Sequence, residues 1–439
     1  MTGRPNVIFV VLDTVRADRV SGLGYERETT PNLDSFAAEA TTYTDAVAHA
    51  PWSVPSHASL FTGEYPATHD TTTAKPILTA GPTLPELLSD AGYGTYAFSA
   101  NEYVRPATGF ARGFDEFHTP WRTEPSVVAD LLAPAVHWIT STPRLRRPVE
   151  RAFNGLRESE SVGSELPSPV DDGLLETTAD ILAYAEEPFF FFANLIDAHL
   201  PRSPSPEYVD EFVDQSLRET PVVQNERAHT VGEAAMDEAG YRKLSQLYDA
   251  DLRTMDDRFG ALLECFREAG VLSDSLVVVV SDHGEHLGEF DLVGHQFSVF
   301  DSVVSVPLVI QFPDGGPDRI DEQVETRRLF ETVLDEAGVQ THDERSLASG
   351  AGDSIARGSY HSPMIDIEAL LFEETVRYDP SLLGEPLSFV RSPDAKRLSF
   401  DGQEWLFETP EHEANSLSNA RIEEIDRTLP GALSESSAD

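Results

Sequence analysis

Apolar residues in this chain cluster in short unbroken runs that are separated by stretches with helical spacing. Each run is rich in β-branched or aromatic side chains, the pattern of strands that are buried on both faces of a parallel sheet. The predicted buried strands are Val7–Leu12, Thr95–Ser99, Phe189–Ile196, Leu276–Val280 and Val306–Phe312. The runs therefore predict one large and mostly parallel sheet.

The stretches between these strands repeat apolar residues at helical spacing and carry residues typical of helix boundaries. Pro31 suits the first turn of a helix, and Gly270 suits the position just after a last turn. The predicted helices are Thr30–Ala40, Thr83–Asp90, Tyr241–Ala269 and Thr326–Ala337. Strands that alternate with helices predict an α/β fold with helices on both faces of the sheet.

Two stretches, about residues 120–185 and 200–235, interrupt this alternation with Pro-rich and polar sequence. We expect both to be insertions on the loop side of the sheet, where ligands bind in open α/β folds. They either shape specificity or are plain surface loops.

A turn at Pro313–Pro317 predicts the end of the large domain. We expect residues 1–315 to form the catalytic domain. Residues 316–439 are expected to form a small C-terminal α+β subdomain with short strands near Ser388–Leu398. The end of the chain is expected to fray.

The charge balance changes the picture of the surface. Lys and Arg number 32 against 76 Asp and Glu, a net charge of −44, and only three of the cations are lysines. High salt screens such self-repulsion, so the composition predicts the cytoplasm of a halophile, with an acidic surface for a basic partner as the alternative. The same charge argues against nucleic-acid binding.

Two further features bear on the compartment and on cysteine chemistry. The run Val7–Leu12 is too short for a signal peptide, and no stretch reaches the roughly 20 apolar residues of a membrane span. We therefore expect a cytoplasmic protein without a membrane span. The single cysteine, Cys265, lies in an amphipathic helical pattern and is predicted to be a buried structural thiol.

Acidic and histidine side chains follow two of the predicted strands directly. Asp13 comes after Val7–Leu12, and the Asp282-His283 pair comes one residue after Leu276–Val280. A carboxylate at the carboxyl end of a strand is well placed for metal binding or catalysis, although it is also a common cap. Carboxylate and imidazole together suit one divalent ion, Mn, Zn, Mg or Ca.

Ser53 precedes a Pro55-Ser56 step that can begin a helix. Free N–H groups and the positive end of the helix dipole would favour an anionic group, such as a sulfate or phosphate ester, next to Ser53. The alternative is ordinary capping by Ser53 or Ser56, with His57 on the surface.

Two more histidines complete the candidate chemistry. His199 follows Phe189–Ile196, and His295 lies between the last two predicted strands. Single histidines are usually structural or exposed, but either one could protonate a leaving oxygen or hold the transferring group. A metal between Asp13 and Asp282-His283 would then activate the Ser53 hydroxyl.

In these segments the chain resembles the sulfatase family of the alkaline-phosphatase superfamily. Asn6–Asp13 is similar to the family's opening strand with its metal aspartate, and Thr30–Asp34 is similar to its T-P-N-L-D step. Ser53–Gly63 is similar to its C/S-x-P-S-R-A-S-L-x-T-G signature. Asp282–Glu285 with Val306–Ile310 is similar to the second metal segment and its following strand, and Phe407–Leu417 is similar to the closing element. The acidic composition adds the expectation of a haloarchaeal-type member.

The resemblance implies an alkaline-phosphatase-like α/β sandwich and metal-dependent hydrolysis of a small-molecule or glycan sulfate ester. It places Ser53 at the nucleophile or formylglycine position and implies one divalent ion. The implied metal ligands are Asp13, Ser53, Asp282 and His283, and the implied catalytic residues are Ser53, His57, His199 and His295.

The chain departs from the family pattern at several of these positions. His57 stands where the family has Arg, Thr14 stands where it has a second metal aspartate, and His295 stands where it has a substrate-holding lysine. The Gly-Lys-Trp-His step is replaced by Ala97–Asn101. The alternatives are a phosphatase, phosphodiesterase or phosphotransferase that uses unmodified Ser53, and a non-catalytic binding homologue. The oligomeric state stays open.

Overall fold

The structure is a computed structural model of the 439-residue chain. It describes residues 4–120, 173–225, 229, 236–289, 292–295, 298–340, 345–361, 386–393, 395–400 and 403–407, apart from positions 74, 351 and 354. Most of the predicted insertion at 120–185, part of that at 200–235 and the closing element after Phe407 lie outside these residues. No helix in the described ranges is long and apolar enough to cross a membrane.

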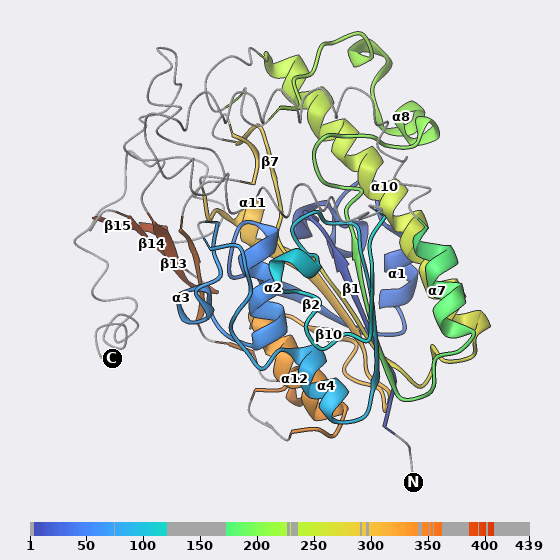
Figure 1. Cartoon of the computed structure of the whole chain (residues 1–439). Helices are drawn as coiled ribbons and strands as arrows, with labels where there is room; N and C mark the ends of the chain where they lie inside the picture. The colour runs from blue at the N-terminus through green and yellow to red at the C-terminus, as the bar shows by residue number, and fades with distance from the viewer. Residues whose placement is uncertain are drawn as a thin grey trace, which may run out of the picture.

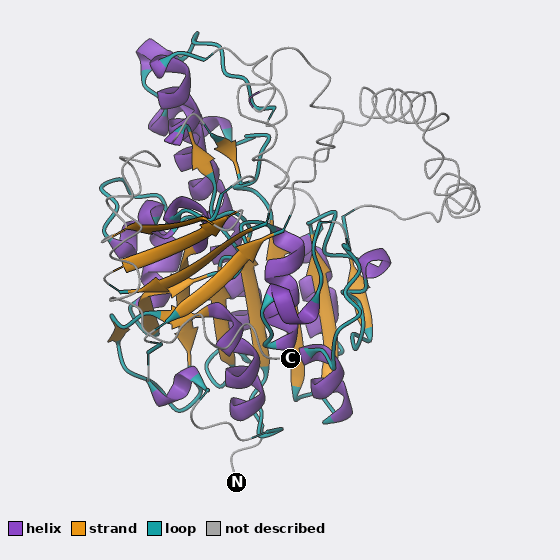
Figure 2. Ribbon diagram, turned by 90° about the vertical axis from the view of Figure 1, so that its left-hand side faces the viewer, coloured by secondary structure: helices purple, strands orange, loops and turns teal. Residues whose placement is uncertain are grey.

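A large mixed sheet forms the centre of the molecule (Figures 1 and 2). Its strand order is β10-β2-β9-β6-β1-β5-β3-β4, with β11 also paired to β2. Its strands are β1 (Val7–Leu12), β2 (Thr41–Val47), β3 (Gly94–Ser99), β4 (Glu116–His118), β5 (Phe189–Leu195), β6 (Leu276–Val280), β9 (Ser305–Gln311), β10 (Arg319–Ile320) and β11 (Val324–Glu325). Strands β6, β1, β5, β3 and β4 are parallel to one another.

Strand β1 shows why the sheet forms here, because all of its residues are buried. Val7, Phe9 and Val11 enter one hydrophobic core, while the alternating Ile8 and Val10 enter the other. Side chains alternate between the faces of a strand, so an unbroken apolar run supplies both cores at once.

Helices cover both faces of the sheet (Figure 1). One core includes residues of α2 (Ser53–Thr62), α4 (Leu84–Asp90) and α12 (Leu329–Glu336). The other includes residues of α1 (Pro31–Ala37), α7 (Leu174–Leu182) and the long α10 (Glu238–Glu268). The remaining described helices are α3 (Pro66–His69), α8 (Pro206–Phe212) and α11 (Asp301–Val304).

The start of α1 shows what the T-P-N-L-D step does in this fold. The carboxylate of Asp256, on α10, accepts hydrogen bonds from the backbone N–H groups of Asn32 at 2.7 Å and Leu33 at 2.9 Å. A helix leaves its first N–H groups without partners inside the helix, and Asp256 satisfies two of them. The step therefore joins α1 to α10.

A second sheet has the order β12-β13-β14-β15 and lies beside α11 (Figure 1). Its strands are Ala356–Tyr360, Leu387–Ser392, Ala395–Phe400 and Gln403–Phe407, all antiparallel. Phe389 and Leu398 pack against Val303 and Val304 of α11. The Lys396 ammonium, 1% exposed as a side chain, pairs with the Asp301 carboxylate at 2.6 Å and adds an ionic anchor.

The observed elements confirm most of the predicted strands and correct one of them. Strands β1 and β6 have the predicted bounds, and β3 and β5 differ by one residue. The prediction that Val306–Phe312 is a parallel strand is wrong, since β9 is antiparallel to β2 and β6. The chain leaves β6 and returns through α11 at the same edge of the sheet, so β9 runs back beside β6 without a crossover.

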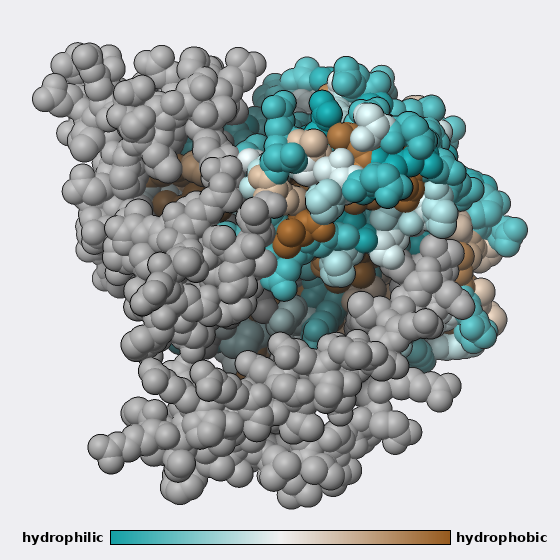
Figure 3. All heavy atoms as spheres, turned by 90° about the horizontal axis from the view of Figure 1, so that it is seen from above, coloured by the Kyte–Doolittle hydropathy of each residue, from teal (hydrophilic) through white to brown (hydrophobic). Residues whose placement is uncertain are grey.

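The remaining differences concern boundaries and one thiol. Strands β10 and β11 pair with β2, so the large sheet takes in residues beyond the expected boundary at 315. A hairpin of β7 (His286–Leu287) and β8 (Val293–Gly294) precedes α11. Cys265 is partly exposed on α10 instead of buried, and it is a free thiol. Seen from above, the described surface is largely hydrophilic (Figure 3), as the acidic composition predicts.

Candidate active site

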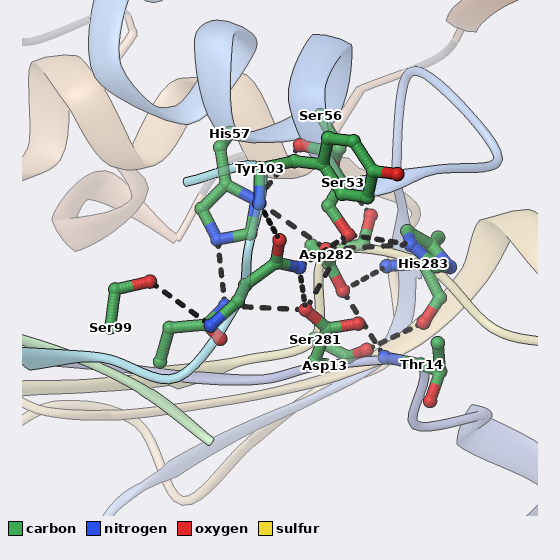
Figure 4. A network of polar contacts seen from close by, with 12 residues as sticks. Asp13, Thr14, Ser53, Ser56, His57, Ser99, Tyr103, Ser281, Asp282 and His283 are labelled. Atoms are coloured by element: carbon green, nitrogen blue, oxygen red, sulfur yellow. Dashed lines mark hydrogen bonds and ion pairs between the residues drawn. The ribbon is translucent and has the colours of Figure 1, made fainter. Parts of the chain in front are cut away.

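Polar side chains gather where four neighbouring strands of the large sheet end (Figure 4). Asp13 follows β1, the Asp282-His283 pair follows β6, Asn194 lies near the end of β5, and Asn101 follows β3. All five are buried, with at most 2% of each residue exposed. Carboxyl ends of parallel strands share one edge, so residues far apart along the chain meet there.

Ser53 is the first residue of α2 and points into this cluster (Figure 4). Its Oγ accepts a hydrogen bond from Asn101 Nδ2 at 2.9 Å. The same oxygen lies 3.3 Å from His283 Nε2 and 3.4 Å from Asp13 Oδ2. No side chain caps this helix, because Trp52 occupies the cap position, so the capping role considered for Ser53 and Ser56 is wrong.

The helix start is tied directly to the segment after β6. Ser56 Oγ donates to the backbone carbonyl of Asp282 at 2.6 Å. Pro55 fits in the first turn, where a missing N–H costs nothing, and Gly63 ends the helix at φ 71°. Ser53 is therefore held at a helix N-terminus, where the local field favours a negative charge.

Asp13, Asp282 and His283 form a group that fits a metal ion. One ligand atom from each lies within 4.8 Å of the others, and all three residues are buried. Asp13 Oδ1 and Asp282 Oδ2 accept no hydrogen bond from any described residue. Burial raises the pKa of both aspartates, and the Asp282 carboxylate raises that of Asp13 further. Two such buried carboxylates call for a cation.

The imidazole of His283 is prepared to act as a ligand. Its Nδ1 lies 2.9 Å from the Gly284 carbonyl, which can only accept, so Nδ1 carries the hydrogen. The lone pair of Nε2 therefore faces Ser53 and the two carboxylates. Burial lowers the pKa of His283 to about 4, so the ring is neutral at pH 7. Mixed carboxylate and imidazole donors suit Zn, Mn or related divalent ions.

Thr14, at the position of the expected second metal aspartate, serves the site through its backbone. Its N–H donates to Asp282 Oδ1 at 3.2 Å, and its φ is 62°, which is rare for a β-branched residue. The His283 N–H donates to the same oxygen at 2.9 Å. These two bonds orient the Asp282 carboxylate and leave its second oxygen facing the cluster.

His57 lies one helical turn after Ser53 and is buried, so the alternative that places His57 on the surface is wrong. Its Nδ1 lies 2.9 Å from the Ser53 carbonyl oxygen, and its Nε2 lies 3.0 Å from Asn194 Nδ2. Carbonyl oxygens accept, so Nδ1 carries a hydrogen, and the same nitrogen lies 3.4 Å from Asp282 Oδ2. Phe110 and Phe192 contact the ring edge to face. His57 therefore supplies hydrogen bonds at the position where the family has a guanidinium.

His199 and His295 form a pair beside His283. Their Nε2 atoms lie 3.3 Å apart, and the His283 and His295 ring centroids are 4.5 Å apart. The Nδ1 atoms face the carbonyls of Leu200 at 2.5 Å and Pro51 at 3.0 Å, so both carry hydrogen. A hydrogen bond between the Nε2 atoms thus needs one further proton. Burial, reinforced by His283, lowers the pKa of His295 and favours release of that proton.

Three further residues of the site were not predicted from the sequence. Asn101 Nδ2 also donates to Asp13 Oδ2 at 2.6 Å, and Asn194 Nδ2 lies 3.4 Å from the same oxygen. Tyr103 is 39% exposed and packs edge to face on Trp52 with ring centroids 6.3 Å apart. The one available sequence signal was Asn194, an amide inside the apolar run of β5, because a buried amide needs hydrogen-bond partners.

Known proteins resemble this chain over most of its length. The uncharacterized sulfatase YidJ of Escherichia coli (strain K12) is 26% identical over 365 residues, which cover 77% of this chain and 68% of that protein. The ulvan-active sulfatase of Formosa agariphila is 26% identical over 313 residues. That match covers 71% of this chain and 56% of the relative, so this chain spans little more than half of the relative's length.

The fold is shared with solved structures of low sequence identity. Phosphonate monoester hydrolase of Agrobacterium radiobacter superposes with a TM-score of 0.68 at 19% identity, covering 92% of this chain and 89% of that one. This likeness supports the alkaline-phosphatase-like α/β fold. The family model described as Sulfatase matches residues 5–339, which include every site residue named above. The chain therefore belongs to the sulfatase family of sulfuric ester hydrolases.

Proposed function

We propose that the protein hydrolyses a sulfate ester, with Ser53 at the nucleophile position. The observation that carries the proposal is the position of Ser53 Oγ, 3.3 Å from His283 Nε2 and 3.4 Å from Asp13 Oδ2 at the start of α2. This oxygen lies between a candidate cation site and the N–H groups of a helix terminus. Membership of the sulfatase family supports the choice of a sulfate ester.

The residues that would hold a divalent ion are Asp13, Asp282 and His283, with Ser53 Oγ beside them. Such an ion would make the Ser53 hydroxyl more acidic and would screen the negative charge of the ester. The orphaned oxygens of Asp13 and Asp282 support this assignment, because buried carboxylates without donors are costly.

The chain's own residues supply the remaining steps of the proposed reaction. Asn101 Nδ2 orients the Ser53 oxygen toward the ester, and Asp13 Oδ2 is the nearest carboxylate to receive the hydroxyl proton. As the bond from Ser53 to sulfur forms, the ester S–O bond breaks and the alcohol leaves. The leaving oxygen also takes up a proton, which the His199–His295 pair would supply once one of its Nε2 atoms has been protonated. Water then releases sulfate from Ser53.

The chemical state of Ser53 is the second part of the proposal. The family's formylglycine would be made from Ser53 by loss of two hydrogens. His57 is a hydrogen-bonding imidazole at the position of the family's Arg. Its contact with the Ser53 carbonyl fixes the backbone of the nucleophile, and the guanidinium fork that would hold a modified side chain is missing. We therefore propose that Ser53 acts as unmodified serine, with formylglycine as the alternative.

A second candidate function follows from the same geometry. An unmodified serine beside a divalent ion can equally attack phosphorus, which would make the protein a phosphatase, phosphodiesterase or phosphotransferase. The observation that favours it is the presence of His57, an imidazole, where a sulfatase usually has a guanidinium. The likeness to a phosphonate monoester hydrolase concerns the fold alone.

Two measurements on the full-length protein in high salt test these proposals. Intact mass of the peptide that contains Ser53 should match serine, and a loss of two hydrogens would contradict the unmodified state. Turnover of an aryl sulfate should exceed turnover of an aryl phosphate and an aryl phosphonate, and the reverse order would favour the second candidate. No turnover together with no bound metal would indicate the non-catalytic homologue.

A matched pair of variants tests the nucleophile itself. Ser53→Ala should lower kcat by about 10⁴-fold or more, in line with loss of a nucleophile in other hydrolases. Ser59→Ala is the control, because Ser59 is buried on the same helix and its Oγ contacts His69 Nε2 at 3.1 Å, away from the cluster. Undiminished activity of Ser53→Ala would overturn the assignment.

A further inference from the structure

A buried arginine stabilises the turn that carries His199. Arg202 lies three residues after His199, and its side chain is 0% exposed. Its Nη1 donates to the backbone carbonyl of Ala198, the residue before His199. The guanidinium therefore bridges the turn, from Arg202 after the histidine back to the Ala198 carbonyl before it.

The partners of Arg202 belong to other parts of the site. Its Nη2 pairs with Glu285, which is also 0% exposed and lies two residues after His283. Its Nε lies 3.8 Å from Asp251 of α10, and its guanidinium stacks 4.6 Å from the centre of the Tyr248 ring. A fully buried guanidinium costs several kcal/mol in lost hydration, so its retention calls for a specific role.

The same cluster reaches the turn after β1. Tyr248 OH donates to the Thr14 carbonyl at 2.7 Å and accepts from the Arg16 N–H at 2.9 Å. Thr14 directly follows Asp13 and binds Asp282 through its N–H. One buried cluster thus connects the three turns that carry the candidate metal ligands and His199.

We propose that Arg202 is a positioning residue that ties the His199 turn to the segment carrying His283. A planar guanidinium can bind the Glu285 carboxylate and the Ala198 carbonyl at the same time, because its donors form a rigid fork. A lysine ammonium keeps the charge but loses this fork. Arg202 acts through His199 and does not itself contact the cluster of Ser53.

Arg202→Lys separates positioning from simple support of the fold. Loss of a supporting residue around a catalytic group typically costs about 10- to 100-fold in activity, so we expect kcat to fall by that factor. We expect KM and the affinity for the divalent ion, measured by titration calorimetry, to change less than threefold. This readout rests on the proposed function, so a spectroscopic measurement accompanies it.

Ring resonances of His199 report its position without any turnover. In protein labelled with ¹⁵N-histidine, the His199 ring signals, assigned with a His199→Gln variant, should shift in Arg202→Lys and in Glu285→Gln. Unshifted signals in both variants would overturn the proposal. If the wild-type protein hydrolyses no ester tested, the proposed function fails, and the ring signals still decide the role of Arg202.

A double-mutant cycle and a matched control complete the test. If Arg202 acts through His199, Arg202→Lys should change kcat less than twofold in a His199→Ala background, and a full additive loss would contradict this. Arg328→Lys is the control, because Arg328 is also buried and holds the carbonyls of Arg345 and Ser346 and the Asp353 carboxylate away from the site. It should lower Tm and leave kcat unchanged.

Discussion

Asn101 makes the contacts whose loss is most informative for the nucleophile assignment. In Asn101→Ala, Asp13 Oδ2 loses its 2.6 Å donor, Ser53 Oγ loses its 2.9 Å donor, and the Tyr103 N–H loses the 2.8 Å acceptor Asn101 Oδ1. A hydrogen bond to a charged group contributes about 1.5–3 kcal/mol and a neutral one about 1 kcal/mol. We therefore expect the free energy of unfolding to fall by about 3–5 kcal/mol.

Asn101→Ala should lose more activity than its lower stability can explain. Without Asn101 the Ser53 oxygen keeps only contacts of 3.3 Å and longer, so its direction is no longer fixed. Removal of one oriented donor at a reacting oxygen typically costs about 10²- to 10³-fold in kcat. Urea unfolding and kcat/KM for an aryl sulfate, both at one fixed metal concentration, measure the two effects, because bound ligand raises apparent stability.

A control variant separates the two effects. Asn32 also donates its side-chain Nδ2 to a buried carboxylate, Asp256 Oδ2 at 2.9 Å, but it lies in the first turn of α1, outside the cluster of Ser53. Asn32→Ala should lower stability and leave kcat within about twofold of wild type. If Asn101→Ala behaves in the same way, Asn101 does not orient Ser53 and the reasoning is refuted.

Three further predictions concern acid sensitivity, metal binding and a helix start. Burial alone would raise the pKa of the Glu289 carboxyl, but the Arg16 guanidinium outweighs burial and lowers that pKa to about 2. The Glu289–Arg16 pair therefore stabilises the fold above pH 4.5, and this stabilisation is lost as the pH falls from 4.5 to 2. Glu289→Gln should flatten acid unfolding in that window, and an unchanged profile would contradict the pairing. Metal affinity by calorimetry should fall as the pH is lowered, since His283 and both site aspartates bind metal only when unprotonated, and a pH-independent affinity would count against them. Asp256→Ala leaves two N–H groups of α1 without partners, so Tm should drop by several degrees without a change in KM.

Much of the fold could be predicted because buried parallel strands carry their own signal. β1 and β6 are unbroken β-branched or aromatic runs, and their bounds were predicted to the residue. β2 was missed because Thr41–Val47 contains three threonines and an aspartate, so it forms neither an unbroken apolar run nor a regular alternation. The direction of β9 depends on where the connection from β6 returns, which no local pattern encodes.

The site was predictable where chemistry and strand ends coincide, and less so elsewhere. Asp13 and the Asp282-His283 pair follow strands directly, and the structure brings them together with Ser53. The buried state of His57 could not be predicted, because it depends on Asn194 and on aromatic rings from distant segments. Asn101 carries no charge and follows no motif, so only the folded arrangement identifies its contacts.

The anchor between Lys396 and Asp301 makes the small sheet chemically observable. The chain has three lysines, and the Lys75 side chain is 64% exposed while that of Lys396 is 1% exposed. An amine-reactive reagent should therefore modify Lys75 at once and Lys396 only when the small sheet separates from α11. The ratio of the two labelling rates would give the population of the separated form, without any engineered probe and under the high-salt conditions of the other assays.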